Sequence, residues 1–163
     1  GFILTRFLIC FMEIVNLLFT EIVNYRAVVA SAVASMVIGS IWYGPLFGKL
    51  FMRETGMDKM SKEKMAAAKK TMWMSYLAQF IASLVMFYGV AFLFSMYGKI
   101  YPTSFTQISI RGGVITGFLV WSCFVVPVKI GDVAWGGKMI LFWLNIGNML
   151  ITLLAVGAII GAW

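Results

Sequence analysis

Residues 39–49 read GSIWYGPLFGK, and this stretch decides the fold because an apolar run ends there at a glycine and a proline instead of at a charge. Trp42 and Tyr43 are amphipathic rings typical of the headgroup depth of a bilayer, with the ring body in lipid and the polar atom in water. Pro45 lacks an N–H and crowds the carbonyl four residues earlier, so a helix kinks or ends there, while Gly44 adopts conformations that other residues resist. We therefore interpret these four residues as the motif at which a membrane helix leaves the apolar layer. The alternative is a helix break that binds a substrate, but such breaks in transporters lie at the midplane and not at the end of a span.

The overall composition predicts an integral membrane protein. Of the 163 residues, 62% are hydrophobic and only 12% are charged, whereas a soluble domain carries about 25% charged residues. A single domain of this size has too little interior to hide that much apolar surface from water. Helices are expected because a backbone group in lipid finds no water, and the sequence lacks the alternating segments of about ten residues that a barrel needs. The predicted fold class is therefore an all-α integral membrane protein.

Four apolar runs are long enough to cross about 30 Å of hydrocarbon, which takes roughly 17–25 helical residues. They cover residues 27–43, 72–97, 112–128 and 139–162, and their polar residues carry no charge. The sequence therefore predicts a bundle of four transmembrane helices, formed by one domain at residues 24–163.

Residues 1–23 form a separate apolar segment that, unlike the four runs, carries charged side chains. Glu13, Asn16, Thr20 and Asn24 are spaced three, four and four residues apart, which places them on one face of a helix. This pattern predicts an N-terminal helix that lies in the interface as an amphipathic helix or crosses the membrane as an additional helix. The alternative is an uncleaved leader or an upstream extension without fixed structure.

The distribution of lysine and arginine predicts the orientation. The basic residues between the first and second runs are Lys49, Arg53, Lys59, Lys62, Lys64, Lys69 and Lys70. Lys129 and Lys138 flank the link between the third and fourth runs, on the same side of the membrane. The opposite side has fewer basic residues, namely Arg26, Lys99 and Arg111. The lysine-rich loop, residues 46–71, is therefore expected in the cytoplasm, in a multi-pass protein of the cell (inner) membrane.

A polar stretch in this loop precedes the second run. Ser61 is expected to cap a helix that begins at Lys62 and continues unbroken into the run. Lys62 then shares a cationic surface with Lys64, Lys69 and Lys70. Anionic lipids are the expected partners of these lysines, each contact contributing about 1 kcal/mol. The alternative is a charged face that contacts water alone.

Turns are expected in the two shorter links. Between the second and third runs, Pro102 begins a turn and Ser104 caps the next helix. Between the third and fourth runs, turns are expected at Gly131, Gly136 and Gly137. The third helix is therefore expected to end before these glycines.

Amides and a hydroxyl share one face of the fourth run. Asn145, Asn148 and Thr152 are spaced three and four residues apart, and Gln79 is the comparable group on the second run. Buried amides usually form hydrogen bonds between helices, worth about 0.6–2 kcal/mol each. The alternative is a polar path or a ligand contact formed by these four residues.

Small residues recur every fourth position in three of the runs. The series are Ser31, Ser35 and Gly39; Gly113 and Gly117; and Gly157 and Gly161. Such residues let helix backbones approach closely in lipid. They predict a tight bundle, and one series is also suited to a contact between subunits.

The sequence offers little for catalysis or metal binding. It has no histidine, and Cys10 and Cys123 each lie inside an apolar segment, where they are expected to act as small hydrophobic residues. We therefore expect no enzymatic activity, no cofactor and no metal site. The net charge of +7 is assigned to topology and anionic lipid, since no nucleic-acid-binding fold accompanies it.

Several motifs resemble a known family. They are WYGPLFGK at 42–49, MAAAKK at 65–70, W-x₂-F-x₂-P at 121–127 and GAIIGAW at 157–163. Together they are similar to the small four-helix membrane proteins grouped as domain of unknown function 1761. The resemblance covers about residues 24–163 and implies four spans, while residues 1–23 depart from the pattern. It implies no activity and no site.

We expect a non-catalytic polytopic membrane protein that acts as an accessory or assembly subunit of a larger membrane complex. Its uncharged spans and small-residue faces suit helix packing, and its N-terminal helix suits docking. Its partners would be the lipid bilayer, anionic lipids, and other membrane subunits or further copies of the chain. The alternative is a small oligomeric transporter or channel with its polar path on the fourth helix.

Overall fold

The computed structural model describes residues 2–19, 23–100, 109–136 and 138–163, and within these ranges the regular structure is helical. The α-helices are α1 (Phe2–Phe19), α2 (Tyr25–Ile41), α3 (Gly48–Thr55), α4 (Lys62–Ile100), α5 (Ile110–Val120), α6 (Val126–Gly136) and α7 (Met139–Ala162). Two π-helical segments, η1 (Trp42–Leu46) and η3 (Trp121–Val125), continue α2 and α5, and a short 3₁₀ turn, η2 (Met57–Lys59), follows α3.

Four stretches of helix are long and apolar enough to cross a membrane. They are Tyr25–Leu46, Lys69–Met96, Ile110–Gly131 and Met139–Ala162. These stretches contain most of each of the four predicted runs, and the all-α fold is confirmed. They extend the first run by a few residues and carry the third run past Lys129.

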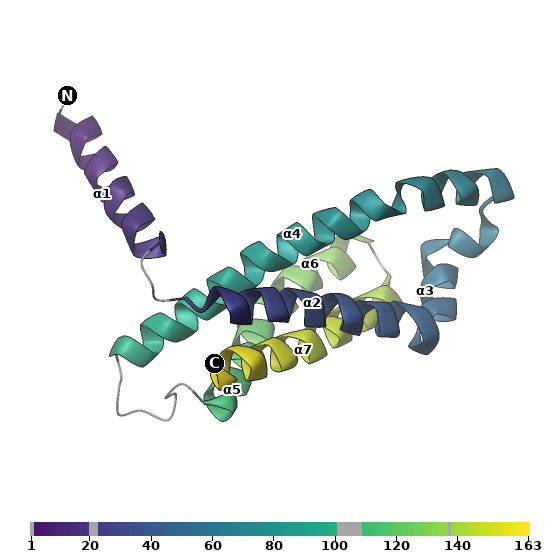
Figure 1. Cartoon of the computed structure of the whole chain (residues 1–163). Coiled ribbons are helices and arrows are strands. Elements are labelled where there is room, and N and C mark those ends of the chain that lie inside the picture. The colour runs from purple at the N-terminus through teal and green to yellow at the C-terminus, as the bar shows by residue number, and fades with distance from the viewer. Residues whose placement is uncertain (1, 20–22, 101–108, 137) are drawn as a thin grey trace.

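The bundle is arranged around α7 (Figure 1). This helix packs most extensively against α5 and next against α2, while α2 also packs against α4. Helix α1 projects away from the bundle, and α4 extends beyond it toward α3 (Figure 1). The last helix in the sequence is thus the central one in space.

Glycines bring α5 and α7 into backbone contact. A Cβ on Gly113 would overlap the carbonyl oxygen of Gly157, and a Cβ on Gly117 would overlap that of Leu153. Two of the three small-residue series therefore face each other, as expected for closely packed helices. The third series differs, because a Cβ on Gly39 would meet no atom within 4 Å.

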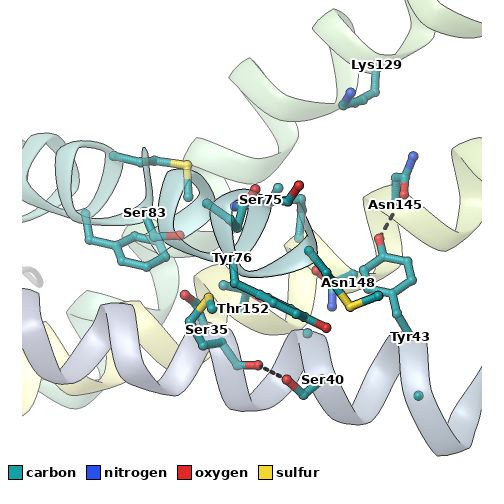
Figure 2. Close-up of a pocket in the computed structure, with 18 residues that line it drawn as sticks. Ser35, Ser40, Tyr43, Ser75, Tyr76, Ser83, Lys129, Asn145, Asn148 and Thr152 are labelled. Carbon is teal, nitrogen blue, oxygen red and sulfur yellow. Dashed lines mark hydrogen bonds between the residues drawn. The ribbon is translucent and has the colours of Figure 1, made fainter. Parts of the chain in front are cut away.

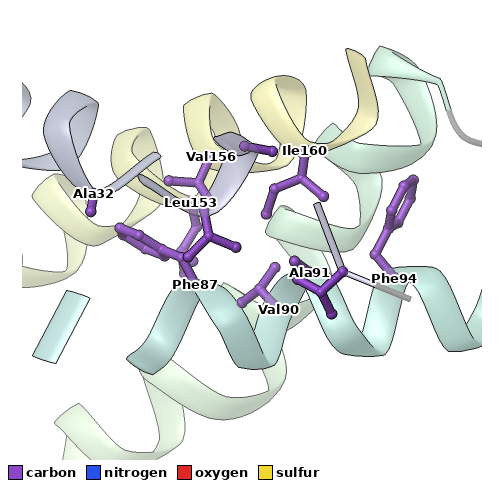
Figure 3. Packing of buried hydrophobic residues seen from close by; sticks show 11 residues of the cluster. Ala32, Phe87, Val90, Ala91, Phe94, Leu153, Val156 and Ile160 are labelled. Atoms are coloured by element: carbon purple, nitrogen blue, oxygen red, sulfur yellow. The ribbon is translucent and has the colours of Figure 1, made fainter. Parts of the chain in front are cut away.

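The hydrophobic core lies at the end of the bundle remote from the lysine-rich loop. Phe87 and Phe94 come from the second half of α4, Leu153 and Val156 from the second half of α7, and Ala32 from the first half of α2; all five are buried. Figure 3 shows these side chains meeting between the three helices. The bundle is therefore closed at this end.

One residue at a helix N-terminus has the role that the sequence predicted, and another has a different role. As predicted, the Ser61 hydroxyl accepts from Lys64 N, at 3.4 Å, and α4 continues unbroken for 39 residues. Asn24 was expected on the N-terminal helix face, but it caps α2 by accepting from the backbone N–H groups of Arg26 and Ala27. The predicted placement of Asn24 on the N-terminal helix is therefore wrong, because α1 already ends at Phe19.

The expectations at Pro45 and Gly131 have different outcomes. As predicted, the first helix is disrupted at Pro45: it changes from α to the wider turns of η1 and ends at Leu46, and Phe47 N donates to Trp42 O at 2.9 Å, because a π turn tolerates the missing N–H. Gly131 makes no turn, since it lies inside α6, whose last residue is Gly136. Ser104 was expected to cap the third helix, but Ser109 caps α5, its hydroxyl accepting from Gly112 N at 3.2 Å. Residues 102, 104 and 137 themselves lie outside the described part of the chain.

Candidate functional site

A cavity of about 560 Å³ lies between α2, α4, α6 and α7, on the lysine-rich side of the core. Polar side chains from these helices converge on it (Figure 2). Its lining residues are Ser35, Met36, Gly39, Ser40, Tyr43, Gly44, Met72, Ser75, Tyr76, Gln79, Ser83, Met86, Phe87, Lys129, Asn145, Asn148, Met149 and Thr152. The bundle is thus packed at one end and hollow at the other.

The four polar residues singled out from the sequence all line this cavity. Asn148 and Thr152 are buried and Asn145 is half-buried on α7, while Gln79 is exposed on α4. Helical periodicity alone places the three α7 residues on one face. The position of Gln79 in the lining of the same cavity depends on how α4 packs, which periodicity does not predict.

Several lining residues were not predicted from the sequence. Ser75 and Ser83 lie four residues on either side of Gln79, so these three share the face of α4 that lines the cavity. Ser35 and Ser40 contribute hydroxyls from α2. The four-residue spacing around Gln79 was the available signal, since a polar face on an apolar helix must meet a polar space.

Lys129 was also missed as a lining residue. The third helix was expected to end before it, whereas α6 continues past it and brings the half-buried Lys129 to the cavity. A second cavity of about 230 Å³ shares Lys129 and Asn145 with the first and is also lined by Lys138. The Lys138 ammonium donates to the carbonyl oxygen of Glu54, at 3.3 Å, and so connects the start of α7 to α3.

The Trp42–Pro45 motif contacts the interior of the bundle as well as forming part of its surface. Trp42 Nε1 donates to Leu144 O at 3.1 Å, and the Tyr43 hydroxyl donates to Asn145 Oδ1 at 2.8 Å. The sequence predicted that both polar atoms contact water; in the structure they bond to α7, because α7 packs beside η1 and offers acceptors there. Tyr43 and Gly44 line the cavity, and Pro45 is exposed.

Asn148 is the most unusual group in the lining. Its side chain is 8% exposed, and among the described residues its Nδ2 atom has no hydrogen-bond partner. A buried donor without a partner costs about 1–3 kcal/mol. Ser31 Oγ is also buried and has no partner in the described ranges, but Ser31 is not part of the cavity lining. The Asn148 amide is therefore a donor available at a cavity wall.

The other predicted positions lie elsewhere. Lys62, Lys64, Lys69 and Lys70 are exposed along the first turns of α4 and line neither cavity. Both cysteines are free and exposed. Within the described residues, no cluster of three histidine, cysteine or acidic side chains is placed to hold a metal ion. What the cavity offers is hydrogen bonding from hydroxyls and amides, a lysine, and apolar contact with methionines.

A family model described as "Protein of unknown function (DUF1761)" matches residues 26–161. Since this match covers most of the chain, the chain belongs to that family, as the motifs indicated. No curated protein and no solved structure matches the chain. An argument about function therefore starts from the cavity.

Proposed function

We propose that this member of the DUF1761 family is a multi-pass membrane protein that binds a small hydrogen-bonding molecule in the cavity between α2, α4 and α7 and carries it without chemical change. The observation that carries the proposal is the buried Asn148 amide, whose Nδ2 has no partner within the described structure. A protein retains an unpaired buried donor at a cost in stability, and a guest with an acceptor oxygen would recover that cost.

The outer surface supports a membrane location. Val29, Val33 and Val37 repeat every four residues along α2 and are 50%, 51% and 53% exposed. In a water-soluble bundle this outward face would be polar, whereas in lipid an apolar face is required. The proposed orientation has the lysine-rich loop in the cytoplasm, so the cavity would open on that side.

The closed core favours a carrier over an open channel. Phe87 lines the cavity and is also fully buried in the core cluster with Leu153 and Val156, so apolar side chains lie between the cavity and the opposite end of the bundle. Passage through one chain would therefore require these helices to move, as in alternating access. This differs from the expectation that an oligomer forms the path, because the polar residues meet within one chain.

The test is to identify what the protein retains. Wild type and Asn148→Leu would be purified in mild detergent, and the small molecules that co-purify would be measured by native mass spectrometry and by extraction. Ser122→Ala is the matched control, because Ser122 bonds to Leu119 O and does not line the cavity. We expect a defined molecule on wild type and the control, reduced about fivefold on Asn148→Leu. Equal retention by all three proteins would reject the proposal.

A second candidate function is docking to another membrane subunit through α1. This helix exposes Phe7, Leu8, Ile9, Phe11 and Met12, and it projects away from the bundle (Figure 1). An apolar surface in a membrane protein is covered by lipid or by a partner, and because α1 stands apart from the bundle we propose that a partner subunit covers it. Deletion of residues 1–19 is expected to remove a stoichiometric partner from the purified complex while the bundle stays folded. An unchanged particle mass after the deletion would argue against docking.

A further inference from the structure

We infer that the molecule held in the cavity is an anionic glycerophospholipid, with its phosphate between Lys129 and Lys138 and a glycerol ester carbonyl at Asn148. This inference rests on the proposed function and names the chemical class of its ligand. It depends on three features of the two adjoining cavities: their charge, the depth of their polar groups, and their apolar lining.

The charge of the lining favours an anion. Lys129 lines both cavities and Lys138 lines the smaller one, whereas no carboxylate occurs among the described lining residues of either. Lys129 is half-buried, and an ammonium group that is partly removed from water attracts an anion more strongly than an exposed one such as Lys138. Basic pockets between membrane helices on the cytoplasmic side are a known kind of site for anionic headgroups.

The depth of the polar groups matches the upper part of a glycerophospholipid. Asn145 lines both cavities and is therefore at the level of the lysines, and Asn148 follows three residues later on α7. At 1.5 Å per residue, Asn148 lies about 4.5 Å deeper along the helix. In a glycerophospholipid the ester carbonyls lie just below the phosphate, and each carbonyl is an acceptor. A carbonyl at this depth would pair with the Asn148 Nδ2 donor, which has no partner among the described residues.

The apolar lining favours a lipid over a soluble phosphate compound. Four methionines, Met36, Met72, Met86 and Met149, line the larger cavity together with Phe87. Methionine is flexible and packs well against irregular apolar shapes such as an acyl chain. A small water-soluble anion would leave these side chains facing water instead.

The cavity is also open toward the surrounding medium. Met72 and Tyr76 of α4 are 42% and 52% exposed although both line the cavity. In a membrane, the medium beside this part of α4 is lipid, so an acyl chain can leave the cavity sideways into the bilayer. A volume of about 560 Å³ therefore needs to hold only the glycerol region and the upper chain.

The experiment measures lipid retained by the full-length protein. Wild type would be incubated with dioleoyl phosphatidylglycerol or dioleoyl phosphatidylcholine and analysed by native mass spectrometry in detergent. The test variants are Lys129→Gln with Lys138→Gln, and Asn148→Leu, which leaves the charge unchanged. The matched control is Lys62→Gln with Lys64→Gln, which removes the same charge from exposed positions outside both cavities.

We expect wild type and the control to retain one phosphatidylglycerol in preference to phosphatidylcholine. The double cavity variant should retain at least tenfold less, and Asn148→Leu about fivefold less. Equal loss in the control and the cavity variant would overturn the inference, because it would indicate a diffuse surface charge effect. If the double variant does not fold, Lys138→Gln alone provides the test, since Lys138 is exposed.

A competition experiment with a soluble phosphate compound distinguishes a lipid headgroup from a free phosphate as the ligand. Glycerol 3-phosphate should not displace the bound lipid at millimolar concentration; displacement, or binding without any chain, would overturn the lipid assignment. Retention of a non-lipid molecule that Asn148→Leu loses would also overturn it but leave the proposed function standing. If no molecule of any kind depends on Asn148, both proposals fail.

Discussion

Trp42 and Trp121 donate their indole N–H groups to main-chain oxygens two residues apart on α7, at 3.1 Å from Leu144 O and 2.8 Å from Ile146 O. Each tryptophan is the first residue of a π-helical segment, one following α2 and the other following α5. Two residues along an α-helix correspond to a rotation of about 200°, so the two contacts lie on nearly opposite sides of α7. Asn145, which lies between the two acceptors in the sequence and lines both cavities, is thereby held in place.

Replacing Trp121 by phenylalanine removes the N–H and keeps most of the ring. The free energy of unfolding should fall by about 1 kcal/mol, the usual size for a hydrogen bond between membrane helices. Unfolding with a denaturing detergent in mixed micelles measures it. Trp73→Phe is the control, since Trp73 is 63% exposed on α4 and should tolerate the change. Equal losses for the two variants would show that the Ile146 contact adds nothing.

The glycine contact between α5 and α7 predicts a larger difference in stability, between alanine variants of Gly113 and Gly89. In Gly113→Ala the new methyl group would overlap the Gly157 carbonyl, so the helices must separate, at a cost of about 1–3 kcal/mol or more. In Gly89→Ala the methyl group meets no atom within 4 Å, and the change should be neutral or stabilising by up to about 1 kcal/mol. The stabilities of the two variants are compared by thermal unfolding followed by size-exclusion chromatography. A stable, monodisperse Gly113→Ala protein would contradict the close packing.

The elements that could be predicted from sequence are those that depend on local signals. Four apolar runs, the Ser61 cap and the polar face of α7 are each encoded within one segment, and each is present in the structure. The continuation of α6 past Lys129 was not predicted, because Gly131 usually marks a turn and helix packing outweighs that preference here. That Gln79 and Asn148 line one cavity depends on the packing of two distant segments, which no local pattern contains.

Within the described structure the Asn148 Nδ2 atom has no hydrogen-bond partner, and this predicts that ligand binding and the stability of the ligand-free protein have opposite requirements. Asn148→Leu removes a buried donor without a partner among the described residues, so the ligand-free protein should become more stable, by about 1–3 kcal/mol. The same variant should lose the cavity ligand. Thermal unfolding of delipidated wild type and variant gives the comparison. If the variant is the less stable of the two, Asn148 has a structural partner and its donor is not reserved for a ligand.

The hydrogen bond between Tyr43 and Asn145 should couple η1 to α7. We expect Tyr43→Phe and Asn145→Leu each to lower stability, and the double variant to lower it by less than the sum of the two. The coupling energy should be about 0.6–1.7 kcal/mol, the range found between membrane helices. A double-mutant cycle measures this directly, and strict additivity would mean that the 2.8 Å contact contributes nothing to the fold.

The direction in which the cavity opens follows from the orientation of the chain. In a background with Cys10→Ser and Cys123→Ser, Lys59→Cys adds one thiol at an exposed position of the lysine-rich loop, and Arg26→Cys adds one at the opposite end of the bundle. The excess of basic residues predicts that a membrane-impermeant maleimide labels Arg26→Cys on intact cells and Lys59→Cys only after lysis. Labelling of Lys59→Cys on intact cells would reverse the orientation. Lys129 and Lys138 would then face the outer leaflet, and the cytoplasmic anionic lipids that favour the proposed ligand would be on the wrong side of the membrane.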